Sequence, residues 1–228
     1  MKMPVHLFNK IVIYLIITLT CVNSMAHSPE IILNNRRYAT PLIEELDDYA
    51  KPINFGKTNN LRRKTGSPFL AKGDYLFIEG YLTDILNNPI ENARIYIWQA
   101  NMFGYYNHLI KNTEDDMKYD IDFVGSGITV TNNLGHYEFT TIIPGYYGKR
   151  APHIHILIKH DLFYQEFETQ MFFPGHPRNL YDDIFLGLGP LQRSLLSPKI
   201  VLVNENNAGD GKYALFNIKL DWIHPNKS

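Results

Sequence analysis

Two histidines separated by one residue, His153 and His155, are the most chemically suggestive feature of this 228-residue sequence. The surrounding run, His153–Lys159, is rich in β-branched residues and is typical of a strand. Side chains at alternate positions of a strand point to the same face, so both imidazoles would lie within reach of one metal ion, with Ile154 in the core. Two histidines on a solvated sheet face would give the same pattern, so the pair alone leaves metal binding open.

Tyrosines are the candidates to complete such a site. Gly145–Pro152 leads into the histidine pair, an earlier segment, Trp98–His108, is also rich in tyrosine, and no carboxylate lies close to the pair in sequence. A phenol has a pKa of about 10, so only a strongly Lewis-acidic ion would deprotonate it at neutral pH. Ferric iron suits imidazole and hard oxygen ligands together.

Four motifs around these residues resemble, in the same order, those of the intradiol ring-cleavage dioxygenases, especially the catalytic subunits of protocatechuate-cleaving members. The motifs are WQANMFGYYNH, TNNLGHYEFTTIIPGYY, RAPHIHI and TQMFFPGHP, and the resemblance covers residues 70 to 222, approximately. It implies a non-haem enzyme that depends on Fe(3+), opens a catechol-type ring with O2 and yields a muconate-type dicarboxylate. No organic cofactor is implied.

The same resemblance implies four iron ligands, which are Tyr106, Tyr147, His153 and His155. Tyr106 and Tyr147 each follow a glycine by two residues, as the ligand tyrosines of the family do, whereas Tyr105 and Tyr146 are the alternatives. Tyr147 would be the ligand that the substrate displaces, and it would take up a catechol proton.

Arg150 and Gln170 are implied as further catalytic residues. Arg150 matches a family arginine that stabilises negative charge on the substrate, and a fixed guanidinium would do this electrostatically. Gln170 matches a family glutamine near the oxygen-binding region. The alternatives are a surface cation for Arg150 and a hydrogen-bonded core residue for Gln170.

The connection from Tyr147 to His153 is shorter than in larger relatives, which removes part of the expected pocket wall. The substrate is therefore open. Protocatechuate is the first candidate, because the motifs favour it, and catechol and its substituted forms are the alternatives.

Short strands are the elements that would position these residues. Strand-like runs occur at residues 75–82, 93–98, 135–142, 153–159, 163–172, 199–203 and 212–222, with Asn, Gly and Pro turn signals between them. This pattern predicts an all-β fold with an antiparallel β-sandwich core. The main irregular insertion is Pro174–Ser197, where short helices are expected.

The N-terminal part divides into two segments before the catalytic domain at residues 71–228. Residues 1–26 read as a signal peptide, because Lys2 and Lys10 precede a short apolar run and Ser24-Met25-Ala26 offers a cleavage site. A retained anchor and a lipoprotein at Cys21 are the alternatives. Residues 27–70 form an arm, with a helix expected to start at Thr40-Pro41 and a loop at residues 54–72.

These features predict an exported protein, periplasmic or secreted, without a stable membrane anchor once the signal is cleaved. Cleavage would remove the only cysteine, so no disulfide is expected. The net charge of −1 gives no basic excess, which argues against a nucleic-acid partner. The expected partners are a small aromatic diol and O2, while the oligomeric state and the role of residues 27–70 stay open.

Two other functions fit parts of the pattern. One is a cupin-like Fe(II) or zinc enzyme, in which a carboxylate and another histidine would complete the metal shell. The other is an exported β-sandwich binding module without a metal. The remaining histidines with a place near the motifs are expected to be solvated or hydrogen-bonded, and they are His108, His136, His160 and His176.

Overall fold

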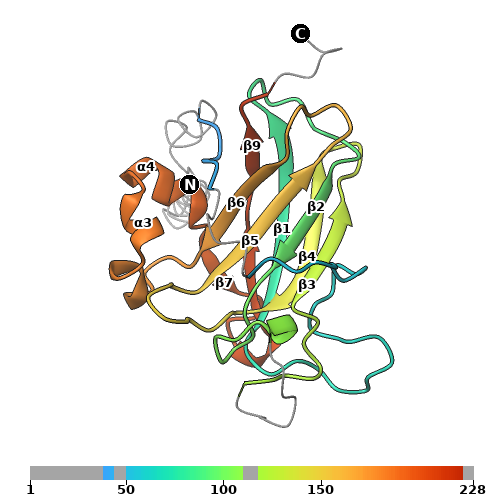
Figure 1. The fold of residues 1–228 in the computed structure, drawn as a ribbon, viewed down its shortest axis with the longest axis vertical. Coiled ribbons are helices and arrows are strands. Elements are labelled where there is room, and N and C mark those ends of the chain that lie inside the picture. Colours follow the sequence, from blue (N-terminus) through green and yellow to red (C-terminus); the bar gives the residue numbers. More distant parts are fainter. Residues whose placement is uncertain (1–37, 44–49, 110–117, 223–228) are drawn as a thin grey trace, which may run out of the picture. The chain divides into compact units, whose positions relative to one another are not determined.

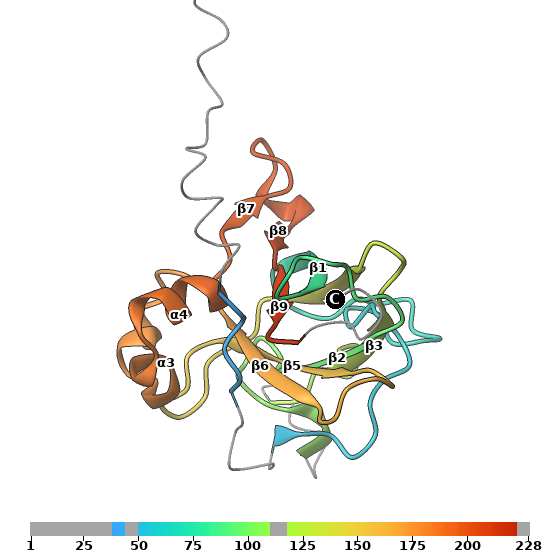
Figure 2. The ribbon, with the colours of Figure 1, turned by 90° about the horizontal axis from the view of Figure 1, so that it is seen from above.

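The computed structural model describes residues 38–43, 50–109 and 118–222. Within these ranges a five-stranded and a four-stranded sheet form a sandwich, which confirms the predicted all-β class (Figure 1). The first sheet has the order β4 (His136–Ile142), β1 (Tyr75–Asp84), β8 (Lys212–Leu215), β7 (Ile200–Leu202), with β9 (Ile218–Leu220) also paired to β1. The second sheet has the order β3 (Ser126–Val130), β2 (Arg94–Trp98), β5 (His153–Lys159), β6 (Phe167–Phe172). Figure 2 shows the two layers from above.

The pairing is not antiparallel throughout. All pairs in the second sheet are antiparallel, as are β1–β4 and β7–β8, whereas β1 pairs with β8 and β9 in parallel. A parallel pair needs a crossover connection. Here the chain between β1 and β8 passes through the entire second sheet before it returns, so the direction of β8 is set by the tertiary fold.

Most predicted strands occur, with differences at their ends. β6 begins at Phe167 instead of residue 163, and the run 212–222 splits into β8 and β9. β3 was not expected from the sequence. This strand contains Gly127, which has a low strand propensity. A Cβ at this position would lie 2.3 Å from the backbone oxygen of Thr58, so close packing against the arm requires glycine here.

Short helices lie in the connections, as expected for Pro174–Ser197. They are η3 (Asn107–Leu109), η4 (Pro177–Leu180), α3 (Asp183–Gly187), α4 (Pro190–Leu196) and η5 (Ala208–Asp210). Figure 2 shows α3 and α4 beside β6, at one edge of the second sheet. Across the described ranges, none of the helices has the length and apolar character needed to cross a bilayer.

The described part of the arm packs on the sandwich without regular structure. Leu61 is fully buried in the core, and its backbone bonds to Thr140 and Val124. The expected helix start at Thr40 is not helical: the Thr40 hydroxyl accepts a hydrogen bond from the Lys219 amide at 2.9 Å, so this segment lies along β9. Residues 44–46 of that helix, and the predicted signal peptide, lie outside the described residues.

Strand β5 is buried on both of its faces, and this positions the site. Its inner face, with Ile154, Ile156 and Ile158, belongs to the main core between the sheets. Its outer face joins a second cluster that includes Trp98, Tyr106 and Leu157. Full burial of each such side chain contributes about 1.5–3 kcal/mol, so the outer face is stabilised in the same way as the core.

Candidate metal centre

His153 and His155 lie on the outer face of β5, as their spacing predicts. They are 2% and 1% exposed, and their Nε2 atoms are 3.1 Å apart. Ile154 between them is fully buried in the core of the sandwich. The alternative of two histidines on a solvated sheet face is therefore wrong.

The loop that carries Tyr106 follows β2 and folds around the buried side-chain amide of Asn101. The Asn101 side chain accepts hydrogen bonds from the Phe103 and Tyr105 amides at 3.0 and 3.1 Å. This turns the Tyr106 side chain inward, where it is 6% exposed and its hydroxyl lies 3.0 Å from His155 Nε2. Tyr105 points outward and is 40% exposed.

The Tyr147 loop follows β4 and docks on the Tyr106 loop. Gly145 donates its amide hydrogen to the backbone carbonyl oxygen of Asn101 at 2.8 Å. Gly104 adopts φ +84°, and a Cβ there would lie 2.1 Å from the Tyr146 carbonyl oxygen, so only glycine allows the two backbones to meet. The Tyr147 hydroxyl then lies 3.3 Å from that of Tyr106 and 3.4 Å from His153 Nε2.

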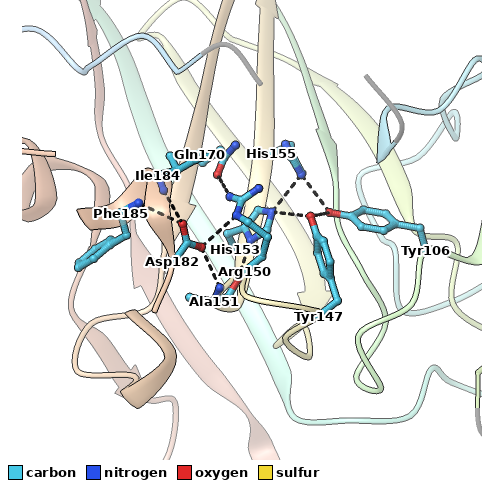
Figure 3. Close-up of polar contacts among 10 residues, drawn as sticks. All are labelled: Tyr106, Tyr147, Arg150, Ala151, His153, His155, Gln170, Asp182, Ile184 and Phe185. Atoms are coloured by element: carbon cyan, nitrogen blue, oxygen red, sulfur yellow. Dashed lines mark hydrogen bonds and ion pairs between the residues drawn. The ribbon is translucent and has the colours of Figure 1, made fainter. Parts of the chain in front are cut away.

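Four donor atoms thus face one another, as Figure 3 shows. Tyr106, His155, His153 and Tyr147 form a ring whose neighbouring donors are 3.0, 3.1, 3.4 and 3.3 Å apart. Bonds of about 2.0–2.2 Å from one metal ion, at angles of roughly 90–110°, separate neighbouring donors by about 2.8–3.6 Å. The donor set therefore fits one ion, with two nitrogens and two hard oxygens.

Both imidazoles are held neutral, as metal ligands must be. Burial, followed by the nearby Arg150 charge, lowers the pKa of His153 to about 3. Burial, followed by His153 and Arg150, also lowers the pKa of His155. His153 Nδ1 lies 2.6 Å from the Ala151 carbonyl oxygen, which can only accept, so the proton is on Nδ1 and the Nε2 lone pair faces the other donors.

Arg150 and Gln170, which the sequence also singled out, lie together beside the histidines. The Arg150 Nη2 atom donates to Gln170 Oε1 at 2.6 Å, and Gln170 pairs in register with His155. Gln170 Nε2 is buried, with no hydrogen-bond partner within the described residues. Arg150 is not a free surface cation, because Asp182 accepts from its Nε at 3.0 Å.

Two residues at the site were missed by sequence reasoning. Trp98 stacks on His155, and Asp182 binds Arg150. The pair Asp182-Asp183 before an apolar run is a recognisable helix start, but nothing in the sequence indicates its contact with Arg150. The partner of Trp98 follows only from the register of β2 against β5.

Three of the other described histidines contact groups outside the donor ring. His136 contacts Glu79 at 2.8 Å, His160 contacts the Glu91 carbonyl at 3.1 Å, and His176 accepts from the Arg178 amide at 3.2 Å. His108 is exposed at the edge of Tyr106, with ring centroids 5.8 Å apart. Within the described part of the chain, no three His, Cys, Asp or Glu residues gather into a metal-binding group.

Comparison with known proteins identifies the family of this chain. The model of a family described as Dioxygenase matches residues 56–221. The protocatechuate 3,4-dioxygenase beta chain of Burkholderia cepacia is 34% identical over 178 residues, which are 71% of this chain and 73% of that protein. A Rickettsia conorii relative is 36% identical over 119 residues, and this match spans 57% of its length.

A solved structure shares the fold. The intradiol ring-cleavage dioxygenase from Tetranychus urticae has a TM-score of 0.62 and 22% identity, covering 84% of this chain and 97% of its own. From its motifs, its family match and its relatives, this chain belongs to the intradiol ring-cleavage dioxygenases.

Proposed function

We propose that this chain is a ferric-iron intradiol dioxygenase that opens a catechol-type ring, with protocatechuate as the first candidate substrate. The family uses non-haem Fe(III) and acts on catechols with O2. The observation that carries the proposal is the ring of donors from Tyr106, Tyr147, His153 and His155, at 3.0–3.4 Å. When bound there, ferric iron would act as a Lewis acid that draws electron density from the catecholate and so makes the ring reactive toward O2.

Tyr147 is the side chain best suited to leave and return. It is half-buried on a loop, whereas Tyr106 is 6% exposed within an apolar cluster. Its hydroxyl has the longest contact of the ring, 3.4 Å to His153. Tyr147 would hold the iron through its phenolate oxygen, and the same oxygen would accept a catechol proton.

Arg150 places a positive charge beside the two histidines. The turn from Tyr147 to Arg150 is closed by the Arg150 amide, which donates to the Tyr147 carbonyl at 2.8 Å, and the Arg150 charge lies close enough to lower the pKa of both His153 and His155. A fixed cation there stabilises negative charge that develops on the substrate. The partnerless Gln170 amide hydrogens are available to a further polar group on the His155 side.

Two observations bear on the identity of the substrate. The name of the Burkholderia cepacia relative supports a carboxylated catechol, protocatechuate. The short Tyr147–His153 segment supports a more open pocket that also accepts catechol and substituted catechols.

The rival functions fit this site less well. A cupin-like Fe(II) or zinc enzyme needs a carboxylate with the histidines, whereas the groups that meet His153 and His155 here are phenols. A metal-free binding module would need no ring of four donors that face one another.

The test is a visible spectrum followed by oxygen uptake. The purified chain, loaded with ferric iron, should show the red-brown tyrosinate-to-iron band and consume O2 with at least one member of a panel of protocatechuate, catechol and substituted catechols. A chain that stays colourless after iron loading contradicts the proposal.

We also propose export through a signal peptide at residues 1–26, which lie outside the described residues. The support is the apolar run after Lys10 and the Ser24-Met25-Ala26 site. N-terminal sequencing of the chain from the secreting host should begin at His27. A cytoplasmic chain that begins at Met1 would overturn this.

A further inference from the structure

Asp182 is a buried carboxylate that lies between α3 and the site. It is 0% exposed, and each of its oxygens accepts two hydrogen bonds. Oδ1 accepts from the Ile184 and Phe185 amides at 3.0 and 3.1 Å, which caps α3. Oδ2 accepts from Arg150 Nε at 3.0 Å and from the Ala151 amide at 2.8 Å (Figure 3).

One branch of this network fixes the guanidinium. Asp182 holds Arg150 through Nε, and Gln170 holds it through Nη2 at 2.6 Å. The Arg150 side chain is only 14% exposed. Because a guanidinium is planar, two partners on different nitrogens set the plane in which it presents its charge.

The other branch leads to a proposed iron ligand. Asp182 accepts from the Ala151 N–H, and the Ala151 carbonyl of the same residue accepts from His153 Nδ1 at 2.6 Å. Groups bonded to the far nitrogen of a ligand imidazole fix its tautomer and orientation. Asp182 therefore holds the backbone that aims His153 Nε2 at the other donors.

Capping alone does not account for this residue. A serine, threonine or asparagine would cap the two α3 amides without placing a charge in the interior. A fully buried carboxylate is unfavourable unless it is paired. Among the described residues, Arg150 is the cation that contacts this carboxylate, so the buried charge of Asp182 is tied to the arginine.

We propose that Asp182 is a positioning residue for ring cleavage, which holds Arg150 and the His153 backbone in the arrangement that the reaction uses. This inference rests on the proposed function. It predicts that the insertion at Pro174–Ser197, through α3, is a support of the site and not only a cover for the sheet edge.

The test is a double-mutant cycle in the iron-loaded chain with Asp182→Ser and Arg150→Met. Serine keeps a hydrogen-bond acceptor for α3 but removes the partner of Arg150 and Ala151. Asp182→Asn is the second variant, should the serine variant fail to fold. Asp84→Asn is the matched control. Asp84 is the last residue of β1, is also fully buried and accepts from the Leu86 and Asn88 amides, in a turn that bears no site residue.

We expect Asp182→Ser to lower kcat about tenfold or more when Arg150 is present, and less than about threefold in the Arg150→Met background. The tyrosinate-to-iron band should also shift in Asp182→Ser, because His153 is no longer aimed by Ala151. Asp84→Asn should lower thermal stability with an unchanged band and kcat.

An equal loss of kcat in both backgrounds with an unshifted band would show that Asp182 only caps α3, and would overturn the inference while the proposed function stands. A wild-type chain without colour or turnover would remove the proposed function, and this inference with it. The two failures are therefore distinguishable.

Discussion

Trp98 lies flat against His155, with ring centroids 4.5 Å apart and an angle of 7° between the planes. The two residues are directly paired between β2 and β5, so the register of the sheet produces the stack. Phe55 packs edge-on against Trp98, with centroids 5.7 Å apart. One face of a proposed iron ligand is thereby sealed from water by the sheet itself.

Trp98→Ala should therefore damage both fold and site. We expect a loss of about 3–5 kcal/mol in the free energy of unfolding, and faster release of iron in a chelator assay. Trp98→Phe should lower the free energy of unfolding much less, because phenylalanine keeps a ring against His155. This variant also removes the indole N–H, which is buried without a hydrogen-bond partner in the described structure. Equal chelator rates for both variants would show that the stack does not protect the metal.

The choice of ligand tyrosines is tested by phenylalanine substitution. Tyr106→Phe and Tyr147→Phe should each shift or weaken the tyrosinate-to-iron band, since each removes an oxygen from the donor ring. Tyr105→Phe and Tyr146→Phe are the matched controls, because both side chains are exposed, at 40% and 48%. A band that responds to a control and not to its neighbour would reverse the register proposed for that loop.

The buried histidines predict a pH dependence of stability in the metal-free chain. Burial lowers the pKa of His153 to about 3 and also lowers that of His155, so between about pH 6.5 and pH 3 the unfolded chain binds protons that the folded chain does not. Stability is full above that window and falls as the pH is lowered through it. At pH 5 the loss should be about 2 kcal/mol for each histidine.

The measurement is urea unfolding of the metal-free chain at pH 7.5 and pH 5. His155→Asn is the control. The free energy of unfolding of this variant should fall less between the two pH values than that of the wild type, by roughly the 2 kcal/mol expected for one histidine. The same loss in wild type and variant would contradict a neutral, buried His155.

Gly104 tests the contact between the two tyrosine loops. Gly104→Ala should lower stability by more than about 2 kcal/mol and abolish the visible band, since its Cβ would lie 2.1 Å from the Tyr146 carbonyl oxygen. Gly66→Ala is the matched control, because Gly66 has a similar φ of +85° but open space around it. Gly66→Ala should lower the stability by only about 1 kcal/mol. Thermal unfolding of both variants, with and without iron, compares the two losses.

Some of the site was determined by sequence alone, for local reasons. The i, i+2 spacing of His153 and His155 places both side chains on one strand face, since strand periodicity is a property of the backbone. The strand runs and turn signals likewise predicted the sandwich, because alternation and turn chemistry act over a few residues. The resemblance supplied the two tyrosines, Arg150 and Gln170.

Tertiary structure decided the relationships between distant segments. The parallel pairing of β8 with β1, the stack of Trp98 on His155 and the bond from Arg150 to Asp182 each join residues far apart in the chain. No local pattern encodes such contacts, since they depend on which strands become neighbours and in what register. The sequence determined which side chains could bind a metal, and packing decided that their four donor atoms meet at one point.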